Sequence, residues 1–206
     1  MTGAALRPLP RSFYARPALR LARDLLGRLL VRRIGRTVIM GRIVETEAYR
    51  PDDPASHSFR GPTARNRSMF GPPGHAYVYV SHGIHHCMNV VAGGGSAVLL
   101  RALEPIDGIR AMARRRGLED ERLLCAGPGR LCQALAVTLS LDGHDLTTGR
   151  SLWVAEGVRS RRAARTPRVG ISSATGHAWR YVDPSSPYLS RAPRWGRAME
   201  RERDSR

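Results

Sequence analysis

The chain of 206 residues contains no lysine, because all 34 of its basic residues are arginine. No side chain can therefore supply the amine of a Schiff base, which leaves only the terminal α-amino group for that chemistry. The arginines outnumber the 17 acidic residues and give a formal net charge of +17. A charge of this size favours a polyanionic partner, of which nucleic acid is the commonest, although it can also serve solubility alone.

Cysteine is scarce, and long apolar runs are absent. The three cysteines, an odd number without disulfide spacing, indicate a reducing compartment. We expect no membrane span, and residues 1–21 lack the continuous apolar core of a secretory signal peptide. The expected location is the cytoplasm, in association with the bacterial nucleoid. An arginine-rich N-terminus without acids before Asp24 leaves a transit peptide as an alternative.

Familiar metal-binding and nucleophile motifs are also missing. The sequence has neither CxxC nor HExxH. The run HGIHHC would not converge on a metal, because on a strand His85 and Cys87 share one face while His86 points to the other. No GxSxG marks a serine nucleophile, and the glycines at 93–95 read as a turn, because no lysine or helix start follows them. We therefore expect no metal and no cofactor.

Hydrophobic periodicity predicts an α+β domain. Pro17 followed by leucines at helical spacing is typical of an amphipathic helix, and residues 50–75 read as a long loop rich in proline, glycine and arginine. Strand-like runs form adjacent hairpins while helical patterns are set apart. We expect strands on both sides of Gly35 and at 76–81, 84–92, 97–105, 151–154, 167–172 and 178–182, and helices at 107–116 and 128–137.

The run GRIVETEAYR places two acids and an aromatic ring at alternate positions of a predicted strand. Period-two geometry sends Glu45, Glu47 and Tyr49 to one face. One explanation is a solvated sheet face on which each glutamate meets an arginine. The other is a base-excision site, in which Tyr77 and Tyr79 add further rings for a splayed-out base and a carboxylate activates water against the glycosidic carbon.

Longer motifs carry a more specific signal. The chain contains, in this order from about residue 12 to 183, the runs RIVETEAY, SHS, ARNRSMFGPPGHAYVYVSHGIHHCMNVV, AVLLRALEP and GPGRLCQALAV. Together they resemble the alkyladenine DNA glycosylase family, also called the mammalian-type 3-methyladenine DNA glycosylases. The resemblance implies one domain over residues 12–190, with a curved antiparallel β-sheet, peripheral helices and a β-hairpin that protrudes toward DNA. A flexible N-terminus over 1–11 and a charged, frayed tail over 191–206 would flank it.

The resemblance also implies the reaction. The family flips alkylated or deaminated purines out of duplex DNA, such as 3-methyladenine, 7-methylguanine, hypoxanthine and ethenoadenine, and hydrolyses the N-glycosidic bond without a cofactor. Glu47 matches the general base that deprotonates the attacking water, and Arg101 matches an arginine that positions the water and the flipped nucleotide. Glu45 has no catalytic counterpart, and we expect it to form a salt bridge. Because lysine is absent, we expect a monofunctional enzyme that leaves an abasic site.

Five further residues match the family's contacts to DNA. Tyr49, His57 and Tyr79 match residues that stack on or contact the flipped base, although the loop between Tyr49 and His57 is one residue shorter than in better-known members. Asn89 matches an asparagine that crowds the exocyclic amine of normal guanine. His82 stands at the hairpin tip where those members place an intercalating tyrosine, so it is either a smaller wedge or an exposed turn residue.

Two other functions are consistent with the charge and the fold class. One is a non-catalytic nucleic-acid binder, which would need positive charge but no carboxylate in its site. The other is an N-glycosidase that acts on RNA or free nucleosides. For the glycosylase we expect a monomer whose partner is double-stranded DNA containing damaged purines, with no membrane contact and a downstream abasic-site endonuclease. Arginines in the loops at 50–67 and 158–168 are expected to contact phosphate.

Overall fold

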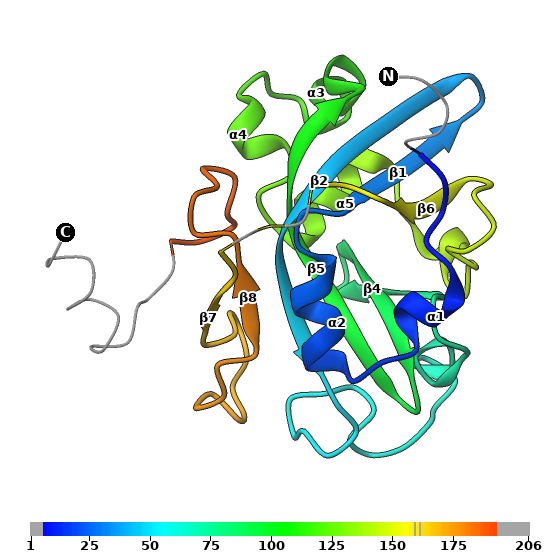
Figure 1. Ribbon diagram of the computed structural model, residues 1–206, viewed down its shortest axis with the longest axis vertical. Coiled ribbons are helices and arrows are strands. Elements are labelled where there is room, and N and C mark those ends of the chain that lie inside the picture. Colours follow the sequence, from blue (N-terminus) through cyan, green and yellow to red (C-terminus); the bar gives the residue numbers. More distant parts are fainter. Residues whose placement is uncertain (1–5, 159, 161, 193–206) are drawn as a thin grey trace, which may run out of the picture.

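The fold is a single α+β domain built on a curved antiparallel β-sheet, seen in a computed structural model that describes residues 6–158, 160 and 162–192 (Figure 1). Within these residues the main path of the sheet runs in the order β3-β4-β5-β2-β1-β6, and β8 joins the free edge of β2 with β7 beside it. The strands are β1 (Leu29–Ile34), β2 (Thr37–Tyr49), β3 (Ala76–Ser81), β4 (His85–Gly93), β5 (Ser96–Asp107), β6 (Leu152–Ala155), β7 (Ala164–Thr166) and β8 (Arg180–Val182). The α+β prediction is confirmed.

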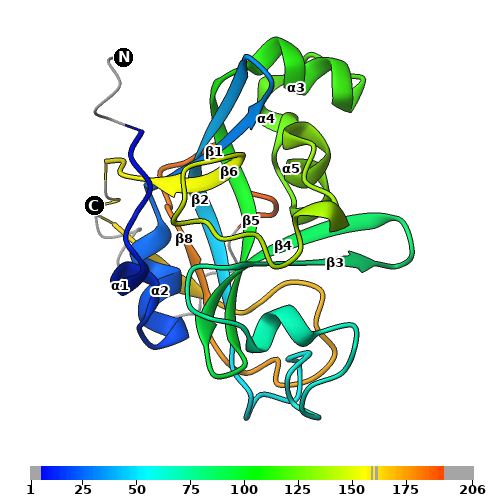
Figure 2. The same cartoon turned by 90° about the vertical axis from the view of Figure 1, so that its right-hand side faces the viewer.

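Helices cover both faces of this sheet. Figure 2 shows α1 and α2 on one side and α3, α4 and α5 on the other. In α2 the buried residues Leu21, Ala22 and Leu25 recur at helical spacing and face the core. The helices are α1 (Arg11–Tyr14), α2 (Ala18–Leu25), α3 (Ile109–Arg116), α4 (Glu121–Leu124) and α5 (Pro128–Leu135), with short 3-10 turns η1 (Arg67–Phe70) and η2 (Leu139–Leu141).

Strand β2 is the centre of the architecture. One edge pairs with β5, and the other pairs first with β1 and then, from Glu45 to Glu47, with β8. The register with β5 shifts twice between Ile43 and Thr46, and such bulges bend a strand and increase its twist. The acidic run, Glu45 to Glu47, therefore lies at the bend, where β2, β5 and β8 meet.

The alternation predicted for β2 is confirmed. Thr46 lies on the face toward α2, where its hydroxyl donates a hydrogen bond to the carbonyl of Ala22 at 2.8 Å. Glu45 and Glu47 both contact Arg101 of β5, so they share the opposite face.

Strands β3 and β4 form a hairpin that projects from the body of the domain (Figure 2). The amide of Ile84 donates to the carbonyl of Ser81 at 3.2 Å, and the two central residues, His82 and Gly83, have φ values of 51° and 74°. This is the geometry of a type I′ turn, which matches the twist of the strands it joins.

Most predicted elements are present, with one error. The strand predicted at 167–172 is wrong: the short strand is β7, which ends at Thr166. Pro167 lacks an amide donor and Gly170 has a φ of 77°, so neither continues a strand. Helices α1 and α4, four residues each, are too short to give a periodic pattern and were not predicted.

The chain termini fall only partly within the described residues. The amide of Leu9 donates to Val154 at 2.8 Å and the indole of Trp153 donates to Leu6 at 2.7 Å, so residues 6–9 lie against β6. Residues 1–5 and most of the predicted tail, 193–206, lie outside the described residues. No helix in the described part of the chain has the length and apolar character needed to cross a membrane.

Candidate active site

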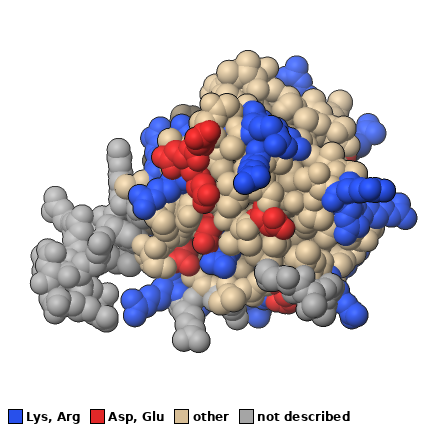
Figure 3. Space-filling view, turned by 90° about the horizontal axis from the view of Figure 1, so that it is seen from above, with Lys and Arg blue, Asp and Glu red and all other residues tan. Residues whose placement is uncertain are grey.

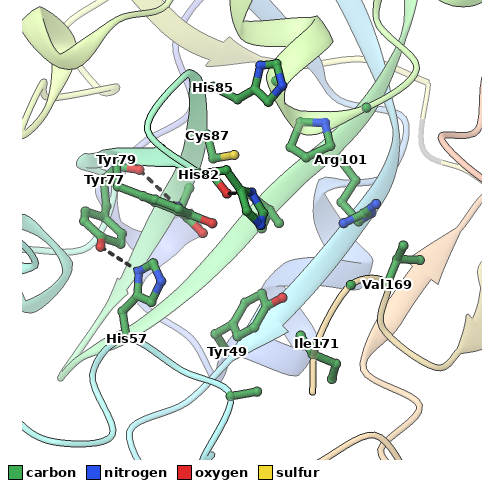
Figure 4. A pocket seen from close by; sticks show the side chains of 18 of the residues that line it. Tyr49, His57, Tyr77, Tyr79, His82, His85, Cys87, Arg101, Val169 and Ile171 are labelled. Carbon is green, nitrogen blue, oxygen red and sulfur yellow. Dashed lines mark hydrogen bonds between the residues drawn. The ribbon is translucent and has the colours of Figure 1, made fainter. Parts of the chain in front are cut away.

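A cavity of about 810 Å³ opens on the face of the sheet that carries the acidic run. Residues from β2, β3, β4, β5, the long loop after β2, the start of α5 and the segment at 169–173 line it (Figure 4). Six of the predicted site residues are among them: Tyr49, His57, Tyr79, His82, Asn89 and Arg101. Glu47 is fully buried and does not itself line the cavity, but its hydrogen-bond partners do.

Among the described residues Glu47 has three partners, and each of them lines the cavity. The hydroxyl of Tyr49 donates to Glu47 Oε2 at 2.9 Å, and the amide of Val169 donates to Oε1 at 2.7 Å. Arg101 Nη1 lies 3.4 Å from Oε2. Burial raises the pKa of Glu47 above its ordinary value, although Arg101, Val169 and Tyr49 act in the opposite direction. The carboxylate is therefore more basic than an exposed glutamate.

Glu45, two residues earlier, has a different environment. Arg101 Nε and Arg180 Nε each donate to its Oε1 at 2.8 Å, and the amide and hydroxyl of Ser190 each donate at 2.7 Å. Burial alone would raise the pKa of Glu45, but Arg180, Arg101 and the Ser190 hydrogen bonds hold it below its ordinary value. The expected salt bridge is confirmed. The hypothesis of a solvated face is wrong, because both glutamates have 0% relative exposure.

Arg101 joins the two carboxylates. It projects from β5, and its guanidinium contacts Glu45, Glu47 and the hydroxyl of Ser190, the last at 3.1 Å. These contacts fix the guanidinium in one orientation while the side chain still lines the cavity.

Aromatic side chains form a second part of the cavity. The rings of Tyr77 and Tyr79 stack with centroids 5.6 Å apart, and the ring of His57 meets Tyr79 edge to face at 4.5 Å. His57 Nδ1 lies 2.8 Å from the Tyr77 hydroxyl. Burial lowers the pKa of His57 and raises that of Tyr77 to about 12, so both side chains are neutral at pH 7. Together with Tyr49, these rings offer neutral faces to a planar ligand.

Asn89 is held against this aromatic group. It lies opposite Tyr77 in the β3–β4 ladder, and its side-chain amide donates to the Tyr77 carbonyl at 3.1 Å. The contact fixes the amide group at the wall of the cavity.

The hairpin tip lies at the mouth of the cavity. His82 lines it, is exposed to solvent and lies 2.9 Å through Nδ1 from the hydroxyl of Ser81. The neighbouring Ile84 is 73% exposed, which is unusual for an isoleucine and was not predicted. The tip thus presents an imidazole and an apolar side chain together.

Two arginines line the cavity on the side of α5. Arg116 bonds to the carbonyl of Leu124 and the side chain of Gln133, and Arg130 bonds to the carbonyl of Ala126. Within the described residues neither forms a salt bridge, so both keep their charge available. Arginines also occur in separate groups over the face seen in Figure 3, with acidic side chains between them. On this face, therefore, charge alone does not mark a single binding surface.

Several contacts of the site could not be found from the sequence. Val169, Arg180 and Ser190 reach the two glutamates from distant parts of the chain, and no motif marks them. No group of three or more His, Cys, Asp or Glu side chains in the described ranges could hold a metal ion.

Comparison with known proteins gives the family context. The family model described as methylpurine-DNA glycosylase matches residues 12–187. A protein of Carboxydothermus hydrogenoformans named "Putative 3-methyladenine DNA glycosylase" is 47% identical over 188 residues, which cover 89% of this chain and 98% of that protein. Proteins of the same name from Nitrosospira multiformis and Rhizobium meliloti are 49% and 51% identical, over 88% and 87% of this chain and 93% and 94% of their own lengths.

Proposed function

This chain belongs to the methylpurine-DNA glycosylase family, enzymes that hydrolyse N-glycosyl bonds in the repair of alkylated DNA, and we propose that it excises damaged purines after flipping them into the cavity beside Glu47. The observation that supports this most directly is the buried, basic carboxylate whose three partners all line the cavity. A general base works best when its pKa is raised toward the working pH.

In the proposed reaction Glu47 takes a proton from a water molecule, which attacks the anomeric carbon of the flipped nucleotide. The new carbon–oxygen bond forms as the glycosidic carbon–nitrogen bond breaks, and the purine leaves with the bonding electrons. Arg101, held by both glutamates, positions the water and the nucleotide. Because Glu47 is fully buried, the attacking water would have to pass between the side chains that separate it from the cavity.

Recognition of the base would rest on several modest contributions to the binding free energy. An alkylated purine can carry positive charge, and the faces of Tyr49 and Tyr79 attract a cation by about 0.5–2 kcal/mol. A protonated His57 would repel such a base, and burial keeps this side chain neutral. Asn89 would crowd the exocyclic amine of normal guanine. The expected lesions are 3-methyladenine, 7-methylguanine, hypoxanthine and ethenoadenine.

The hairpin tip and the two arginines would face the DNA. His82 would enter the space left by the flipped nucleotide, and Ile84 beside it is a suitable apolar wedge. Arg116 and Arg130 would contact phosphates next to the flipped nucleotide. Flipping costs a few kcal/mol and costs least at poorly paired bases, which adds selectivity for damage.

The absence of lysine supports a monofunctional enzyme. A glycosylase that also cuts the strand needs an amine for a Schiff base, and no side chain of this protein offers one. The product would be an intact abasic site, to be processed by an abasic-site endonuclease.

The experiment uses an end-labelled duplex with one hypoxanthine, beside duplexes with ethenoadenine, methylated purines, uracil or no damage. Wild-type protein, Glu47→Gln and the exposed control Glu119→Gln are compared, and products are separated with and without hot alkali. We expect alkali-dependent cleavage at the purine lesions with the wild type and the control, and none with Glu47→Gln. Tight binding without excision of any lesion would indicate a DNA-binding protein instead, and cleavage without alkali would contradict the monofunctional reaction.

A further inference from the structure

Arg168 and Asp53 form a buried ion pair behind the cavity. Both side chains have 0% relative exposure. Arg168 Nη2 donates to Asp53 Oδ1 at 3.0 Å, and Nη1 donates to Asp53 Oδ2 and, at 3.1 Å, to the carbonyl of Ala48. A two-pronged pair of this kind fixes the plane of the guanidinium. Arg168 belongs to the basic segment at 158–168, but its burial excludes it from the expected phosphate contacts.

The guanidinium also lies against two aromatic rings. Its central carbon is 4.7 Å from the ring centroid of Tyr49 and 5.1 Å from that of Trp179. Tyr49 lines the cavity and Arg168 does not, so the arginine supports the ring of Tyr49 from the protein side. The phenol can therefore tilt away from the cavity only by displacing a buried charge pair.

Both neutral hydrogen-bond donors of Glu47 depend on this arginine. Val169, whose amide donates to Oε1, is the next residue in the chain, and Tyr49, whose hydroxyl donates to Oε2, is the ring that Arg168 supports. The guanidinium of Arg168, anchored by Asp53 from 115 positions earlier in the chain, thus lies behind the donors to both oxygens of Glu47.

We propose that Asp53 and Arg168 are positioning residues for the general base: their ion pair holds the amide of Val169 and the hydroxyl of Tyr49 on Glu47. This inference rests on the proposed role of Glu47. Neither side chain of the pair touches DNA or the reacting atoms, because both side chains have 0% relative exposure.

The Asp53–Arg168 pair should also affect the pH dependence of excision. Donors to a carboxylate stabilise its ionised form and lower its pKa, so loosening both donors raises the already elevated pKa of Glu47 further. Excision needs the ionised form, and its rate falls as pH drops through that pKa. Weakening the pair should therefore move the acid limb of the pH profile upward by about one unit, with about a tenfold loss of rate below it.

The test compares two variants. Asp53→Asn keeps the shape of the side chain but removes its charge. Arg168→Lys keeps the charge but cannot form the two parallel hydrogen bonds to Asp53. The control is Asp24→Asn, which removes the charge that pairs with Arg16 at 2.6 Å, in a partly buried pair that does not line the cavity. Two quantities are measured in each protein: the pH profile of single-turnover excision, and the pKa of Glu47 from a carbon-13 NMR titration assigned with Glu47→Gln.

We expect both variants, but not the control, to raise the pKa of Glu47 and move the acid limb together. An unchanged pKa and limb in Asp53→Asn and Arg168→Lys would overturn the proposal, even if both variants unfold at lower temperature, because the pair would then serve stability alone. If the wild type excised no lesion, the proposed function would fail, while the NMR titration would still decide whether the pair sets the environment of Glu47.

Discussion

Glu45 and Glu47 share the guanidinium of Arg101, at 2.8 Å from Nε and 3.4 Å from Nη1, yet their pKa values shift in opposite directions. Glu45 has a second cation, Arg180, and two hydrogen bonds from Ser190. For Glu47, burial outweighs its partners. One carboxylate is thus a fixed anion and the other can take up a proton, which is how two neighbouring acids acquire different roles.

Removing the charge of Glu45 should destabilise the fold strongly. Glu45→Gln leaves Arg101 and Arg180 without their shared anion in a buried site, and breaking a buried pair in this way costs about 3–5 kcal/mol of unfolding free energy. Denaturant titration measures the loss. The control is Glu104→Gln on β5, whose pair with Arg42 is partly exposed and contributes about 0–1 kcal/mol. Similar losses in the two variants would contradict a structural role for Glu45.

The two glutamates should also give opposite pH trends in stability. The pKa of Glu47 is raised on folding, so the folded protein holds this proton longer, and ionisation of Glu47 costs stability as pH rises from the ordinary glutamate pKa through the raised one. The pKa of Glu45 is lowered, so its contribution is present above the ordinary glutamate pKa and is lost as pH falls through the lowered one.

The direction of each pH trend in stability can be measured with variants of the two glutamates. Relative to the wild type, Glu47→Gln should gain unfolding free energy as pH rises through its window, by about 1.4 kcal/mol for each unit of raised pKa. The wild type should have a higher unfolding free energy than Glu45→Gln, and this difference should shrink as pH falls through the lowered pKa of Glu45. Unfolding free energies measured from roughly pH 2 to 8 test both trends. Parallel trends in the two variants would show that the two environments are not distinct.

The sequence predicts the parts of the site that depend on local geometry. Alternation along β2 places Glu45, Glu47 and Tyr49 on one face because side chains of a strand alternate, whatever the rest of the fold does. Family motifs supply the other lining residues. The contacts that set the two pKa values could not be predicted, because Val169 and Ser190 reach the glutamates across 122 and 145 positions of chain. Such contacts depend on the packing of loops that have no periodic pattern.

The error at 167–172 has the same origin. The segment is held by the burial of Arg168 against Asp53 and by the amide of Val169 on Glu47, not by strand pairing. An arginine in a basic segment is normally read as exposed, and only the tertiary structure shows that this one is closed off with a carboxylate.

The hairpin tip should matter most where the DNA resists opening. His82→Ala and Ile84→Ala each remove part of the side chains that would fill the space of the flipped nucleotide. We expect both variants to lose more activity on a stably paired lesion than on the same lesion opposite a mismatched base, because the wedge offsets the cost of unpairing. Single-turnover excision on the two duplexes measures the ratio. Equal losses on both would rule out a wedge and leave His82 as a turn residue.

The arginines beside α5 should determine part of the salt dependence of DNA binding. Each phosphate contact adds nearly one unit to the slope of log affinity against log salt, so Arg116→Gln and Arg130→Gln should each reduce that slope by about one. Both side chains line the cavity, and their hydrogen bonds to described residues go to uncharged acceptors, so their charge is available to phosphate. The control is Arg36→Gln, an exposed arginine in the turn between β1 and β2 that does not line the cavity. Binding of Glu47→Gln, with and without each change, to a hypoxanthine duplex over a salt series keeps excision out of the measurement. A slope that changes with Arg36 and not with Arg116 or Arg130 would place the DNA on a different surface and separate the cavity from the binding face.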